Sequence, residues 1–118
     1  MSNLQETKVK EWTADYITAL NDNFYNQQVD TYQRMISEGR YTDHAIDQLR
    51  NVKTRDARYL YTWKALEGRK YYKIVYQTFD EDDNRFRLGS VHAFIDKHTG
   101  EVYKAASWQN PEIGRAHV

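Results

Sequence analysis

Apolar residues recur every three or four positions through the first part of the chain. They are Val9, Trp12, Tyr16, Leu20 and Phe24, with Ile17 on the same stripe. This spacing predicts a long amphipathic helix over residues 4–26. The stripe loses phase at Gln27 and Gln28 and restarts at Val29, so either one helix bends near Asn26 or two helices meet there. Further helices are expected over residues 29–52, with a helix stop at Gly39.

After Lys53 the apolar period changes to two, which is typical of half-buried strands. Turn-forming segments at 67–70, 80–84 and 97–100 divide this region into four strands. The pattern predicts a four-stranded antiparallel meander over residues 57–106, followed by a tail. In the third strand the apolar phase slips after Leu88, where Gly89 and Ser90 indicate a β-bulge.

Helices followed by a run of strands indicate the α+β class, with the long helix packed on one face of the sheet. The 118 residues contain no internal repeat or low-complexity linker, so a single domain over residues 1–118 is expected. The chain has ten tyrosines and three tryptophans and few leucine, isoleucine and valine residues, so its core is expected to be built largely from aromatic side chains.

Composition excludes several kinds of chemistry. The chain has no cysteine, which rules out disulfides, thiolate metal sites and a cysteine nucleophile. No apolar stretch approaches the roughly 20 residues that span a bilayer, and residues 1–10 do not resemble a signal peptide. A soluble intracellular protein with no membrane partner is therefore expected.

The net charge is zero, but it is unevenly distributed. Residues 1–49 carry −4, residues 50–78 carry +6, residues 79–83 carry −4 and the remainder carries +2. The acidic helices can pair with the basic middle inside one fold. The alternative is a basic surface for an anionic partner.

The segment from Val91 to Trp108 contains two histidines close to an aspartate. On a strand, His92 and Asp96 share a face but lie about 13 Å apart, which is too far for one metal ion. The shaping of a tight turn is enough to explain Asp96, Thr99 and Gly100 without any catalytic or metal-binding role. The acidic loop 80–84 also fails as a calcium loop, since Arg85 and Val91 stand where glycine and glutamate are required.

No nucleotide-binding or nucleophile motif is present in the chain. The sequence therefore predicts no catalytic residue, no metal and no cofactor, and a protein that is not an enzyme. An enzyme acting on a small molecule without a recognisable motif is the third hypothesis. Whether His44, His92, His98 and His117 meet in space is left open.

The best candidate for function is the strand around residues 69–77. Basic and aromatic residues alternate onto one face there, which suits phosphate binding and base stacking. The candidate binding face comprises Arg58, Lys64, Arg69, Tyr71 and Lys73. The same alternation is also typical of a half-solvated strand. Trp108 is expected to fold back onto the core or to cover a sheet edge, and an exposed Trp108 would instead mark a partner site.

The C-terminal quarter resembles a signature of small phage-encoded proteins of unknown function. The matching residues are Val91, Ala93, Phe94, Ile95, Asp96, Thr99, Gly100, Glu101, Val102, Tyr103, Lys104, Ala106, Ser107, Trp108 and Pro111. Ala105 replaces the usual proline, and Glu112 and Ile113 replace a basic and small run. The resemblance implies a bacterial virus and the cytoplasm of its infected host, and it implies no activity.

Together these features predict an accessory protein that acts by binding, with a protein partner or another copy of itself. The alternative is binding of single-stranded nucleic acid or RNA through the basic aromatic face of the sheet.

Overall fold

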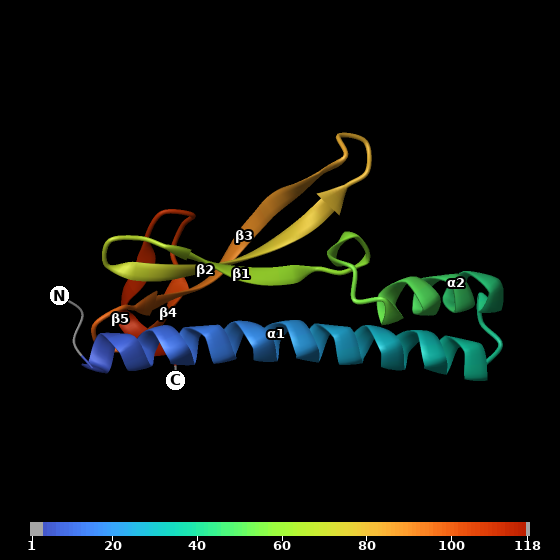
Figure 1. Cartoon of the computed structure of the whole chain (residues 1–118), viewed down its shortest axis with the longest axis horizontal. Coiled ribbons are helices and arrows are strands. Elements are labelled where there is room, and N and C mark those ends of the chain that lie inside the picture. Colours follow the sequence, from blue (N-terminus) through green and yellow to red (C-terminus); the bar gives the residue numbers. More distant parts are fainter. Residues whose placement is uncertain (1–3, 118) are drawn as a thin grey trace.

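The structure, a computed structural model, describes residues 4–117, without the side chains of residues 114–117. Two helices precede a five-stranded sheet (Figure 1). The elements are α1 (Leu4–Ser37), α2 (Thr42–Lys53), the 3-10 helix η1 (Ala57–Tyr59), β1 (Thr62–Glu67), β2 (Tyr71–Asp80), β3 (Arg85–Asp96), β4 (Val102–Ala105) and β5 (Pro111–His117). The strands pair in chain order and all pairs are antiparallel, which confirms the α+β class and the meander.

Helix α1 is continuous, so of the two alternatives the single long helix is confirmed, and the boundary near residue 26 was wrong. Glutamine favours helix, and Gln27 and Gln28 do not interrupt it. The apolar stripe changes phase because the partner of the helix changes. The first half of α1 lies under the sheet and the second half runs beside α2 (Figure 1). The predicted stop at Gly39 is confirmed, with a φ of 68°.

The sheet differs from the prediction at both ends. Residues 57–59 form a 3-10 turn rather than a strand, because the Asp56 carboxylate accepts a hydrogen bond from the Arg58 N–H at 2.9 Å. The tail contributes a fifth strand, β5, which pairs with β4. β5 begins at Pro111, at the edge of the sheet, where the missing N–H of proline is tolerated. The four-strand prediction missed it because these residues show no clear alternation.

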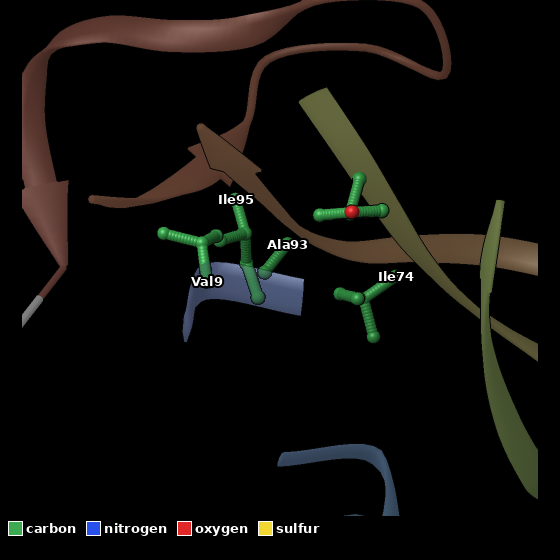
Figure 2. Close-up of a cluster of buried hydrophobic side chains, with 5 residues drawn as sticks. Val9, Ile74, Ala93 and Ile95 are labelled. Atoms are coloured by element: carbon green, nitrogen blue, oxygen red, sulfur yellow. The ribbon is translucent and has the colours of Figure 1, made fainter. Parts of the chain in front are cut away.

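The main core lies between the first half of α1 and the sheet. Val9 of α1 meets Ile74, Ala93 and Ile95, which are all buried (Figure 2). Further along α1, the Phe24 ring stacks on Tyr61 at 5.3 Å and meets the edge of Trp63 at 5.6 Å. These three rings are half-buried or exposed, and among the buried hydrophobic residues of the described chain only Tyr72 and Phe94 are aromatic, so the prediction of a largely aromatic core was wrong.

The predicted bulge in β3 is confirmed. The register between β2 and β3 shifts on both sides of the Val75–Val91 pair, so His92 is one extra residue and Gly89 and Ser90 face a single residue, Tyr76. The Tyr76 ring lies directly over Gly89, because a Cβ at Gly89 would be 2.1 Å from its Cζ. The glycine is needed for this close contact.

The molecule is elongated, with dimensions of 54 × 29 × 26 Å. Its radius of gyration is 17.2 Å, whereas a compact chain of this length has about 13.5 Å. Two extensions account for the difference: the helical pair of α2 with the end of α1, and the outer part of the β2–β3 hairpin (Figure 1). Neither helix has the length and apolar character to cross a membrane, within residues 4–117.

Candidate functional site

One face of the sheet packs on α1, and the opposite face carries the predicted basic residues. Side chains alternate along a strand, so Tyr71, Lys73 and Val75 point away from the core residues Tyr72 and Ile74. Residues that pair across strands share a face. Lys64 pairs with Val75, Lys73 pairs with Leu66 and Phe94, and Phe94 pairs with Tyr103. Lys64, Tyr71, Lys73 and Tyr103 therefore lie on one face.

Three aromatic rings meet at the centre of this face. The Tyr71 ring lies edge-on to Phe94 at 5.8 Å and to Tyr103 at 6.2 Å. Phe94 is buried and gives the cluster a fixed base. The Tyr103 hydroxyl donates a hydrogen bond to the Glu101 carboxylate, which raises the pKa of Tyr103 to about 12. Tyr103 is therefore a neutral phenol at physiological pH.

The loop between β4 and β5 brings Trp108 to the same face. The Lys73 ammonium lies 4.6 Å from the centre of the Trp108 ring, a cation–π distance. The Ser107 hydroxyl shapes the loop by accepting from the backbone N–H groups of Gln109 and Asn110. Trp108 remains 42% exposed, so it contacts Lys73 and also presents its ring to solvent.

The cations around these rings are not neutralised by neighbouring acids. Lys64, Arg69, Lys70 and Lys73 form no salt bridge with any residue that the structure describes. Nearby Glu67 is paired with Lys97 at 2.8 Å. Arg69, Lys70, Tyr71 and Lys73 line a shallow hollow of about 310 Å³ with Phe94 and Gln109. We define the basic aromatic face as Lys64, Arg69, Lys70, Tyr71, Lys73, Tyr103 and Trp108.

Arg58, which the sequence placed with this group, lies elsewhere. It belongs to η1, and its guanidinium pairs with Asp56 at 2.6 Å. The pairing raises the pKa of Arg58 and lowers that of Asp56. Arg58 lines a different hollow, of about 370 Å³, with Phe24, Tyr59 and Phe79. It is a neutralised cation at the other end of the sheet.

Helix α1 does not cover the basic aromatic face. The acidic helix and the basic middle of the chain do meet, since Arg55 pairs with Asp22 of α1 at 2.9 Å and stacks over Tyr25. That contact lies after α2, away from Tyr71 and Lys73. Internal pairing therefore neutralises part of the basic segment and leaves its strand residues free of acidic partners within the described chain.

The described histidines lie in three separate places. The Tyr16 hydroxyl and His92 Nε2 are 2.8 Å apart, in a hollow between α1 and β4 that Lys104 also lines. Burial raises the pKa of Tyr16 and lowers that of His92. His98 Nδ1 lies 2.6 Å from the Glu6 carboxylate, and His44 meets the ring of Tyr32. Within residues 4–117, no three histidine, aspartate or glutamate side chains converge as a metal site, and the His117 side chain lies outside the description.

The turn after β3 is built by Asp96. Its carboxylate accepts hydrogen bonds from the backbone N–H groups of His98 at 2.7 Å and Thr99 at 3.1 Å. The Thr99 hydroxyl accepts from the Glu101 N–H, and Gly100 has a φ of 78°. A Cβ at Gly100 would lie 3.4 Å from both Val9 and Trp12, so the turn packs against the start of α1.

Sequence patterns did not identify Lys70 and Tyr103 as members of the basic aromatic face. Tyr103 belongs to it because β4 pairs with β3 in a register that places it beside Phe94. Strand alternation alone leaves that register undetermined. Lys70 lies in the β1–β2 turn, where alternation gives no direction, and its ammonium lies 5.4 Å from the Tyr71 ring.

Comparison with known proteins gives one match. No curated protein and no solved structure matches the chain. A family model described as a family of unknown function, DUF7717, matches residues 1–115. Because this match covers nearly all of the sequence, the chain belongs to the DUF7717 family.

Proposed function

We propose that this protein acts by binding rather than by catalysis, and that its basic aromatic face binds single-stranded nucleic acid. One observation carries the proposal. Lys64, Arg69, Lys70 and Lys73 have no acidic partner among the described residues, and they surround the accessible rings of Tyr71 and Trp108 on a face that α1 leaves open.

Single strands need two kinds of contact, and this face offers both. Cations neutralise the phosphates, and aromatic rings stack on the bases. Stacking contributes about 1–3 kcal/mol per base without reading the sequence. The face is built from strands and loops and presents no α-helix of the kind that enters the major groove of a duplex. We therefore expect a preference for single strands and little dependence on base sequence.

Part of the basic aromatic face is already ordered in the free protein. Phe94 is buried beneath Tyr71 and Tyr103, so these rings do not have to be ordered on binding. Trp108 rests on Lys73 in the free protein. A phosphate that binds Lys73 would replace this cation–π contact and release the indole to stack on an adjacent base.

The enzyme hypothesis has less support. The ionisable pair Tyr16 and His92 lies on the α1 side of the sheet, where the two groups are hydrogen-bonded to each other.

We also propose that this is a phage protein that works in the cytoplasm of the infected bacterium. The resemblance of its C-terminal quarter to the phage signature supports this source.

The test is fluorescence anisotropy with a labelled thymidine 20-mer and the matching duplex, at several salt concentrations. With three or four phosphate contacts, affinity for the single strand should fall roughly twenty- to fifty-fold between 50 and 200 mM salt. An R69A/K73A variant should bind at least tenfold more weakly and with a shallower salt slope. R58A is the matched control, because Arg58 is paired with Asp56 away from the face. Equal binding by R69A/K73A and the parent would refute the proposal.

A further inference from the structure

The outer part of the β2–β3 hairpin projects beyond the rest of the sheet. β1 pairs with β2 only as far as Gln77, and β4 pairs with β3 only at Phe94 and Ile95. We call residues 77–88 the hairpin arm. Beyond the Gln77–Leu88 pair it is a two-stranded ribbon that points away from β4 and β5 (Figure 1).

One side of the hairpin arm is apolar and incompletely covered. Phe79 pairs with Phe86, and Leu88 lies on the same side because it pairs with Gln77. The rings of Phe79 and Phe86 are 5.1 Å apart. Phe86 is 44% exposed and Leu88 is 45% exposed. Phe79 is partly covered in the hollow that it shares with Phe24 and Tyr59, whereas Phe86 and Leu88 remain open to solvent. Exposed apolar groups of this kind mark interaction sites.

The tip of the hairpin arm is acidic. Arg87 pairs with Asp80 and Asp83, and Arg85 lies 3.9 Å from Asp83. Four carboxylates against two guanidinium groups leave the tip with a net charge of −2. Glu81 and Asp82 form no ion pair with any other described residue.

The two ends of β2 thus carry unpaired charge of opposite sign. The basic aromatic face begins at Tyr71, and the acidic tip follows Asp80. A strand of ten residues is about 33 Å long, so the tip cannot fold onto the face of its own chain. The helical extension, unlike the tip, offers no net negative charge that could bind the basic aromatic face. Its acids pair locally, as in Arg34–Asp30 and Arg50–Asp47, and residues 29–53 have no net charge.

We propose that the hairpin arm of one copy docks on the basic aromatic face of a second copy, in a two-fold symmetric dimer. Glu81 and Asp82 meet the cluster of Arg69, Lys70 and Lys73, and the apolar side of the arm covers Tyr71 and Trp108. Two-fold symmetry makes each contact twice, so both arms and both faces are used. The inference rests on the proposed function in one respect: the dimer covers the nucleic-acid face, and a single strand competes with the arm.

Charge reversal tests the pairing directly. A tip variant, E81K/D82K, and a face variant, K70E/K73E, should each dimerise at least tenfold more weakly than the parent in analytical ultracentrifugation at 50 mM salt. When the two variants are mixed, both contacts of the mixed dimer again join opposite charges. The mixture should therefore dimerise at concentrations where each variant alone is monomeric. Far-ultraviolet circular dichroism checks that both variants are folded.

Several results would overturn the inference. A parent that stays monomeric at 200 µM protein and 50 mM salt has no such dimer. A parent dimer that survives either reversal, or a mixture without rescue, places the interface elsewhere. The tip variant keeps an intact basic aromatic face, so it separates the two proposals. It should bind the thymidine 20-mer as tightly as the parent or more tightly. If neither the parent nor the tip variant binds the oligonucleotide while the mixture of variants still dimerises, nucleic-acid binding is refuted and the dimer stands.

Discussion

The side-chain amide of Asn21 holds the backbone of Trp63 at the outer edge of the sheet. The Asn21 carbonyl oxygen accepts from the Trp63 N–H at 2.7 Å, and the Asn21 amide nitrogen donates to the Trp63 carbonyl at 3.3 Å. Among residues 4–117, no strand lies next to β1 on that side. Asn21 supplies the pair of hydrogen bonds that a further strand would make, and so it protects the edge and fixes α1 against it.

Replacing Asn21 with alanine should therefore destabilise the protein. The change leaves the N–H and carbonyl of Trp63 partly buried without their partners, which costs about 1–3 kcal/mol. Asn23→Ala is the matched control, because Asn23 is exposed on the same helix and both variants gain the same helix propensity. Urea unfolding measures both, and equal free energies of unfolding would show that the Asn21 bonds contribute nothing.

Gly89→Ala should be destabilising because of Tyr76. The new Cβ would lie 2.1 Å from Cζ of the ring, and contact with the Tyr61 ring, whose centre is 5.6 Å away, restricts the movement of Tyr76. Overpacking of this kind costs about 1–3 kcal/mol. A double-mutant cycle with Tyr76→Ala checks the cause. The double variant should be more stable than the two single losses predict, and strict additivity would place the strain elsewhere.

The Tyr16–His92 pair predicts a pH dependence of stability. Burial lowers the pKa of His92 from 6.5, so the unfolded chain takes up the proton first as the pH falls. The free energy of unfolding contributed by neutral His92 is therefore present above pH 6.5 and is lost as the pH falls through the lowered pKa.

A His92→Gln variant isolates this contribution, since glutamine does not titrate and the other histidines are unchanged. The ring is partly exposed, so the loss between pH 7.5 and 5.5 should stay below about 1.4 kcal/mol, the value of one pKa unit. The parent should lose more stability than the variant over this range in urea unfolding. An equal loss in both proteins would assign the pH effect to other groups.

Asp96→Ala should weaken the β3–β4 turn and its contact with α1. The substitution removes the acceptor for the N–H groups of His98 and Thr99. Since Asp96 is buried, we expect a loss of about 1–3 kcal/mol. Asp96→Asn keeps one acceptor oxygen and should recover part of this loss. Thermal unfolding compares the three proteins, and an alanine variant as stable as the parent would mean that the carboxylate does not hold the turn.

Local patterns predicted much of the fold. The 3.6-residue spacing of apolar positions predicted α1, the two-residue spacing predicted β2 and β3, and the phase slip at Gly89 predicted the bulge. These features depend on residues close together in the chain. The sequence left the continuity of α1 open and missed the strand β5, because each depends on its partner. α2 takes up the apolar stripe of α1, and β4 supplies the hydrogen bonds of β5.

The candidate site divides in the same way. The sequence by itself determined that Tyr71 and Lys73 share one face of a strand, because side-chain alternation is a property of the extended backbone. Only the tertiary structure decided that Tyr103 and Trp108 join them, that Arg58 does not, and that α1 covers the other face. Pairing register, loop path and ion-pair partners come from contacts between distant segments, and no local pattern in the chain specifies them.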